Sequence, residues 1–123
     1  WEQGIAEDYF DLFLQTGKQF DAVVCNNDTM ALGVIDSCKK NGISGVPVLG
    51  IDATADGCAA IQAGDMAFTV YQSGSGQGEA AVKAAIALGS GGTTQGMEGL
   101  SDDGLYVWVP CEKVDSSNVA DYQ

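Results

Sequence analysis

The segment DAVVCNNDTMALGVIDSCKKNGI, residues 21–43, decides the fold of this 123-residue chain. Its first part is a short apolar, β-branched run, which is typical of a strand buried on both faces. Asn26, Asn27 and Asp28 follow, and these residue types favour turns and helix caps. A helical pattern begins directly afterwards and stops at Gly42. Because Asp28 alone can cap that helix, the two asparagines are candidates for another role.

The same alternation of strand and helix continues along the chain. Besides the first strand at 20–25 and its helix, helices are predicted over 2–16, 54–64 and 75–89, and strands over 46–51, 66–71 and 105–110. Alternating elements joined by short connections imply a parallel sheet with right-handed crossovers and helices on both faces. We therefore predict an α/β fold with a doubly wound, mostly parallel sheet.

Composition restricts the functions open to the chain. The net charge is −12, with five lysines, no arginine and no histidine. Binding to nucleic acid needs clustered Lys and Arg, so no nucleic-acid partner is expected. Without histidine no Ser–His or Cys–His pair can form, and we predict no catalytic residue, metal site or cofactor. The four cysteines are interpreted as small buried hydrophobes, with a disulfide as the alternative.

Polar residues follow three successive strands of the predicted sheet. Asn27 follows the first strand, Asp52 the second and Gln72 the third. Ligands of an open α/β sheet bind beyond the carboxyl ends of its strands. Asp52 is not needed as a helix cap, because Thr54 can cap the next helix. Amides donate and accept hydrogen bonds and carboxylates accept them, so we expect these residues to cluster and bind a polyhydroxylated ligand.

Residues 21–72 closely resemble the C-terminal lobe of type I periplasmic sugar-binding proteins, the ribose-, galactose- and inositol-binding proteins of ABC importers. Three motifs in this order carry the resemblance: a strand followed by NNDTMALG, a strand ending in GID, and a strand ending in an amide after TV. The resemblance implies a flavodoxin-like lobe. It also implies that Asn27, Asp52 and Gln72 hydrogen-bond sugar hydroxyls and that Trp1 packs on the sugar ring. Core packing or a disordered terminus is the alternative for Trp1.

The resemblance also implies a division of the chain. Residues 1–72 would form the core of the C-terminal lobe, 73–104 a hinge crossing with a helix that packs on the N-terminal lobe, and 105–123 the return strand and tail. The chain begins with Trp and the family's N-terminal lobe is missing, so a fragment is expected. The apolar helix at 75–89 then needs a partner, which a homodimer of the fragment or its own sheet would supply.

The function implied by the resemblance is capture of a monosaccharide or polyol for the membrane permease of an ABC importer. The location implied is extracytoplasmic, in the periplasm or as a cell-surface lipoprotein. One alternative is the effector-sensing domain of a lactose-repressor-class regulator. Those domains usually carry Pro-x-Asp before the strand and G-F-D-D after it, whereas NGISGVPVLGIDAT has a single Asp. The other alternative is a response-regulator receiver domain. The placement of Asp28, Asp52 and Lys113 does not match the acidic pair and the K-P turn of such a domain.

Overall fold

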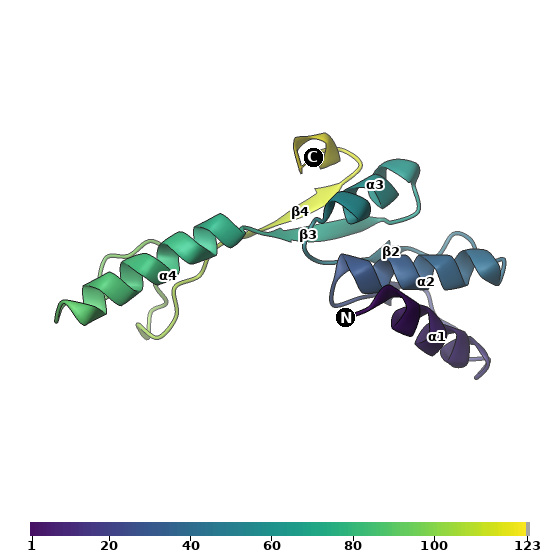
Figure 1. The fold of residues 1–123 in the computed structure, drawn as a ribbon, viewed down its shortest axis with the longest axis horizontal. Coiled ribbons are helices and arrows are strands. Elements are labelled where there is room, and N and C mark those ends of the chain that lie inside the picture. The colour runs from purple at the N-terminus through teal and green to yellow at the C-terminus, as the bar shows by residue number, and fades with distance from the viewer. Residues whose placement is uncertain (123) are drawn as a thin grey trace. The chain divides into compact units, whose positions relative to one another are not determined.

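The computed structural model describes residues 1–122 and is built on a four-stranded sheet with flanking helices (Figure 1). Its helices are α1 (Gln3–Leu14), α2 (Asp28–Lys40), α3 (Ala55–Ala63) and α4 (Gly74–Gly89), followed by a 3-10 helix, η1 (Val119–Tyr122). Its strands are β1 (Val23–Val24), β2 (Val48–Leu49), β3 (Phe68–Gln72) and β4 (Cys111–Asp115).

The order of strands in the sheet is β1-β2-β3-β4. The pairs β1–β2 and β2–β3 are parallel, with Val23 beside Val48 and Leu49 beside Phe68. The prediction of an α/β fold with a mostly parallel sheet is therefore confirmed. Within residues 1–122, no helix is long and apolar enough to cross a bilayer.

The chain divides into two compact units. Unit 1 comprises Trp1–Tyr71 and the segment from Glu112 onward, and unit 2 comprises Gln72–Cys111. Unit 1 holds the parallel strands and helices α1 to α3, whereas unit 2 holds α4 and the loop after it. The predicted division into lobe core, hinge crossing and return segment stays a prediction.

The last strand lies later in the chain than predicted. We expected it at 105–110, but the strand is Cys111–Asp115. Residues 105–110 form a loop with an isolated antiparallel bridge between Leu100 and Val107. Aromatic and β-branched residues favour extended backbone, but strand formation also needs a pairing partner and a buried face. In β4 that face is supplied by Val114, which is fully buried.

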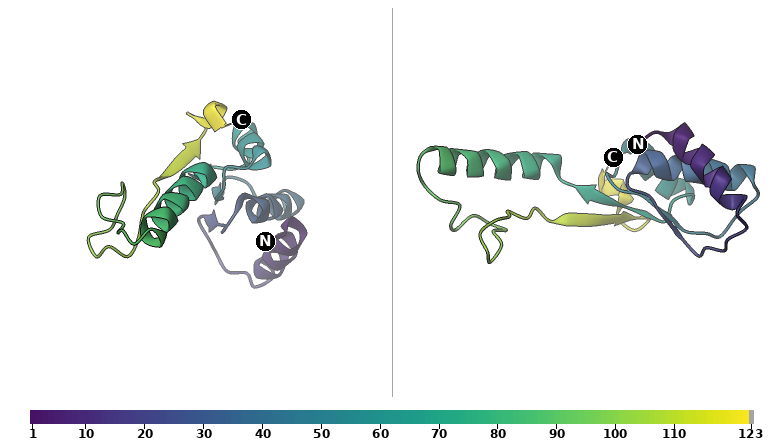
Figure 2. Two further views of the ribbon diagram at one scale, coloured as in Figure 1. Left: turned by 60° about the vertical axis from the view of Figure 1, so that its left-hand side comes forward. Right: turned by 90° about the horizontal axis from the view of Figure 1, so that it is seen from below.

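Helix α1 packs along α2 (Figures 1 and 2). The close approach is possible because residue 33 of α2 is glycine, and a Cβ there would clash with the backbone carbonyl of Gln3. Polar contacts reinforce the packing at both ends: Gln3 Nε2 donates to Asp36 at 2.7 Å, and Lys40 Nζ to Asp11 at 2.7 Å. The two helices therefore run in the same direction, with their N-termini at the same end.

The core of unit 1 is built mainly from small and branched apolar side chains. Cys25, Cys38 and Cys58 are part of it, which confirms the interpretation of these cysteines as buried hydrophobes. Cys111 departs from the prediction, because it is exposed at the start of β4. All four cysteines are free thiols.

The contact at Gly33 gives a test of the α1–α2 packing. We expect Gly33→Ala to lower the free energy of unfolding by about 2 kcal/mol or more, because the added methyl group forces the two helices apart. The matched control is Gly4→Ala in α1, where a Cβ meets nothing within 4 Å. Ala is the better helix former, so the control should be neutral or stabilising by up to about 1 kcal/mol. Urea unfolding measures both, and equal effects would contradict the packing.

Candidate functional site

Helix α2 is capped by Asn27, and the prediction that Asp28 is its N-cap is wrong. Asn27 has an extended backbone, and its Oδ1 accepts a hydrogen bond from the backbone N–H of Met30 at 2.8 Å. Asp28 is instead the first residue of the helix and is completely buried. Both residue types are good caps. Asp28 does not act as the cap because hydroxyl and backbone N–H donors elsewhere in the fold bind its carboxylate.

Asp28 accepts hydrogen bonds from two threonines that lie far along the chain. Its Oδ2 accepts from the backbone N–H of Thr54 at 2.8 Å and from the Thr54 hydroxyl at 3.1 Å. Its Oδ1 accepts from the hydroxyl of Thr69 in β3 at 2.5 Å. Gly50 and Gly57 enclose the carboxylate so closely that a Cβ at either position would clash with it. This buried carboxylate therefore joins α2 to β3 and to the segment between β2 and α3.

Asp52 and Ala53 form a strained turn. They directly precede Thr54, which donates two hydrogen bonds to the buried carboxylate of Asp28. Their φ angles are 109° and 50°, in the region that L-residues other than glycine rarely adopt. Two hydrogen bonds from backbone N–H groups hold the turn: Asp52 N–H donates to the backbone carbonyl of Val70 at 2.8 Å, and Ala53 N–H donates to the side-chain hydroxyl of Thr69 at 3.3 Å. Strain of this kind gathers at functional sites.

The environment of Asp52 alters its acidity. Asp52 is exposed, yet its pKa is raised above the ordinary 3.8. The larger cause is the partial loss of water around its carboxyl group, and the smaller cause is the negative charge of Asp28. The carboxylate is a hydrogen-bond acceptor when ionised. Its role in binding a ligand at the end of β2 stays a prediction.

The structure brings the segments that carry Asn27 and Asp52 together. Strands β1 and β2 pair in parallel, and beyond their carboxyl ends the N–H of Asp28 donates to Ile51 O at 2.8 Å. Asn27 and Asp52 directly flank this bond in sequence. Gln72 is the last residue of β3 and the first of unit 2. Its membership of the same cluster stays a prediction.

Trp1 lies at the end of unit 1 from which both α1 and α2 begin. It lines an apolar pocket together with Ile5, Tyr9, Cys25 and Met30. The indole is 77% exposed, so it is not part of the core. A flat, exposed aromatic at this end of the helices is compatible with packing on a ligand, which stays a prediction.

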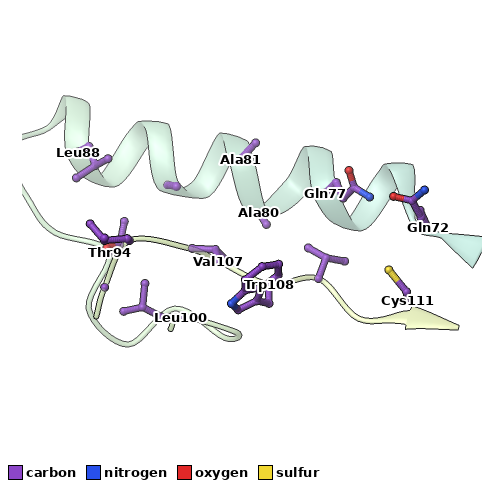
Figure 3. A pocket seen from close by; sticks show the side chains of 14 residues that line it. Gln72, Gln77, Ala80, Ala81, Leu88, Thr94, Leu100, Val107, Trp108 and Cys111 are labelled. Atoms are coloured by element: carbon purple, nitrogen blue, oxygen red, sulfur yellow. The ribbon is translucent and has the colours of Figure 1, made fainter. Parts of the chain in front are cut away.

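Sequence reasoning missed an apolar pocket inside unit 2 (Figure 3). Its volume is about 640 Å³, and it lies between α4 and the loop that follows. Ala80 of α4 points toward Trp108 of the loop, and Leu88, Leu100 and Val107 are among the other apolar residues of the lining. Its lining contains no charged side chain. The alanines on one face of α4 were the feature of the sequence that could have indicated this pocket.

The strained turn can be tested without any ligand. Ala53→Gly should leave the free energy of unfolding within about 0.5 kcal/mol of the original, because relief of the left-handed strain offsets the flexibility that glycine adds to the unfolded chain. The matched control is Ala59→Gly at an exposed position of α3, which should cost about 1 kcal/mol. Thermal unfolding of both variants measures the difference, and equal losses would argue against strain at Ala53.

Comparison with known proteins shows which family the chain resembles. The family described as "Periplasmic binding protein domain" matches residues 1–93. A protein of Rhizobium meliloti named as rhizopine-binding is 35% identical over 125 residues, which cover 100% of this chain and 38% of that protein. The D-galactose/methyl-galactoside binding periplasmic protein of Haemophilus influenzae is 32% identical over 125 residues, covering 99% of this chain and 37% of that protein.

A solved structure is similar to nearly the whole chain. It is an ABC transporter solute binding protein from Bacillus halodurans with bound myo-inositol, at 32% identity and a TM-score of 0.73. The match covers 98% of this chain and 39% of that structure. The chain thus spans less than half the length of these relatives. The likeness confirms the predicted lobe of the type I fold, and the chain belongs to the periplasmic binding protein domain family.

Proposed function

We propose that this chain is the C-terminal lobe of a solute-binding protein that captures a monosaccharide or polyol for an ABC importer. The observation that carries the proposal is the Asp52 carboxylate, presented on a strained turn beyond the carboxyl ends of β1 and β2. The relative named as binding galactose and the solved structure with bound myo-inositol support the same ligand class. In this proposal the protein binds and releases its ligand and carries out no reaction on it.

Each proposed ligand-binding residue has a distinct part. Asp52 accepts hydrogen bonds from ligand hydroxyls. Asn27 uses its Oδ1 to cap α2, so its Nδ2 is the group that donates to a hydroxyl oxygen. Gln72 can donate and accept, and the indole of Trp1 covers the apolar C–H face of a sugar ring. This set of groups suits a neutral ligand that has many hydroxyls.

The remaining partners follow from the same proposal. A second, N-terminal lobe would close over the ligand, because enclosure between preorganised surfaces gives polar ligands their affinity. The membrane permease of the importer would receive the loaded protein. The relative named as periplasmic supports an extracytoplasmic location, and we propose either the periplasm or attachment to the cell surface as a lipoprotein.

Removal of the Asp52 carboxylate tests the proposed function. In the complete two-lobed protein, Asp52→Ala should weaken binding by roughly 2–5 kcal/mol, because ligand hydroxyls are left without an acceptor in the closed site. Calorimetry with D-galactose and with myo-inositol measures the dissociation constants. Asp56→Ala is the matched control, since Asp56 is an exposed acid in the first turn of α3. An unchanged dissociation constant in Asp52→Ala would rule out its role.

We also propose that the isolated chain pairs with a second copy through unit 2. Helix α4 has no buried residue, and the side chains of Val82, Ile86 and Trp108 are 58%, 66% and 66% exposed. An exposed apolar surface of this kind is unfavourable in water. The N-terminal lobe is proposed to cover it in the complete protein.

Light scattering of the isolated chain should therefore report a dimer. Ile86→Glu should shift it to a monomer, because a charge would be buried in the pairing surface. Gln95→Glu adds the same charge at an exposed loop position of unit 2 and should leave the dimer intact. A chain that stays monomeric at all concentrations would contradict the pairing.

A further inference from the structure

We propose that Asp28 is a positioning residue, which acts through Thr54 and Thr69 to hold the Asp52–Ala53 turn so that the Asp52 carboxylate faces a ligand hydroxyl. This inference rests on the proposed binding role of Asp52. Asp28, the third residue of the Asn-Asn-Asp motif, would then have a role other than capping α2.

The position of Asp28 is fixed by its surroundings. Its side chain is completely buried, and Gly50 and Gly57 contact its carboxylate so closely that neither position has room for a methyl group. Asp28 also begins α2, where the neighbouring cap at Asn27 fixes the backbone. The carboxylate therefore cannot move without moving α2, and it provides a rigid reference point below the turn.

The hydrogen bonds around Asp28 have a definite direction. The Thr69 hydroxyl accepts from the N–H of Ala53 at 3.3 Å and donates its own proton to Asp28 at 2.5 Å. The Thr54 hydroxyl accepts from the N–H of Gly57 at 3.1 Å and donates to Asp28 at 3.1 Å. Because an ionised carboxylate only accepts, it orients both hydroxyls so that their oxygens face the backbone. The relay from Asp28 through Thr69 thus reaches the turn at Ala53, and the relay through Thr54 reaches the first turn of α3.

The turn needs such support because its backbone is strained. Asp52 and Ala53 both have positive φ angles, of 109° and 50°, without being glycine. A strained conformation persists only where the surrounding structure determines it. The relay holds Ala53 through Thr69, and Asp28 holds the next residue directly through the Thr54 N–H, at 2.8 Å. Without the relay, the turn would relax and the Asp52 carboxylate would lose its direction.

Asp28 also acts on Asp52 through its charge. Its negative charge raises the pKa of Asp52, as the second cause after burial. Removal of that charge should therefore lower the Asp52 pKa toward its ordinary value.

The test compares Thr69→Val with Thr69→Ser in the complete protein. Valine keeps the shape of threonine but removes the hydroxyl, so the relay is broken; serine keeps the hydroxyl. We expect Thr69→Val to raise the dissociation constant for D-galactose or myo-inositol by roughly 10-fold or more. Thr69→Ser should recover most of that loss. The three-bond HN–Hα coupling of Ala53, which reports its φ, should change in the valine variant only.

Ser37→Ala is the matched control for the loss of a buried hydroxyl. Ser37 is completely buried and donates to the Asp11 carboxylate at 2.5 Å, on the side of α2 that faces α1. Its removal should lower stability but leave ligand binding and the Ala53 coupling unchanged. If Ser37→Ala weakens binding as much as Thr69→Val, the effect is one of general stability and the proposal is wrong.

Asp28→Asn supplies the second readout, an NMR titration of the Asp52 carboxyl group. A fall in the Asp52 pKa in this variant together with a changed Ala53 coupling in Thr69→Val supports the proposal, and unchanged binding together with an unchanged Ala53 coupling in Thr69→Val overturns it. If Asp28→Asn does not fold, the Thr69 pair decides alone. If the unmodified protein binds neither probe, the proposed function fails, whereas a changed Ala53 coupling in Thr69→Val still shows that the relay holds the turn.

Discussion

The structure of unit 1 depends on the buried Asp28 carboxylate. Burial of a charged group is costly unless hydrogen bonds replace its lost water. Asp28 receives three such bonds, from the Thr54 N–H, the Thr54 hydroxyl and the Thr69 hydroxyl. Bonds to an ionised acceptor are stronger than bonds between neutral groups. Because the donors lie 26 and 41 residues along the chain, this one side chain ties α2 to the β2–α3 connection and to β3.

The Asn-Asn-Asp motif therefore divides two tasks between Asn27 and Asp28. Asn26 is exposed, Asn27 caps α2 and keeps an amide donor, and Asp28 points inward to hold the turn at Asp52. The hydrogen bond from Met30 N–H to Asn27 and the hydrogen bonds to the Asp28 carboxylate support each other, because both sets fix the first turn of α2. A site that must present one carboxylate in a set direction benefits from this rigidity, because less freedom is lost on binding.

The sequence was sufficient for the order of elements, the parallel sheet and the residues that follow its strands, because apolar runs and caps are local signals. It was not sufficient to choose between Asn27 and Asp28 as the cap, since that choice depends on Thr54 and Thr69, which are distant in sequence. The positive φ angles of Asp52 and Ala53 were also unpredictable, because neither residue is glycine. The strand expected at 105–110 failed for a related reason: propensity does not identify a pairing partner.

The charge distribution of the lobe favours a neutral ligand over an anionic one. Lys39 and Lys40 lie in the last turn of α2, at the opposite end of that helix from Asn27, and both pair with acidic side chains there. The end that carries Asn27 instead presents Asp52, with the buried Asp28 beside it. A phosphate group brought to this end would meet negative charge in a partly desolvated setting, where repulsion is less screened than in water. Hydroxyl groups carry no such penalty and can donate to a carboxylate, so the same charge that disfavours an anion suits the proposed polyol ligand.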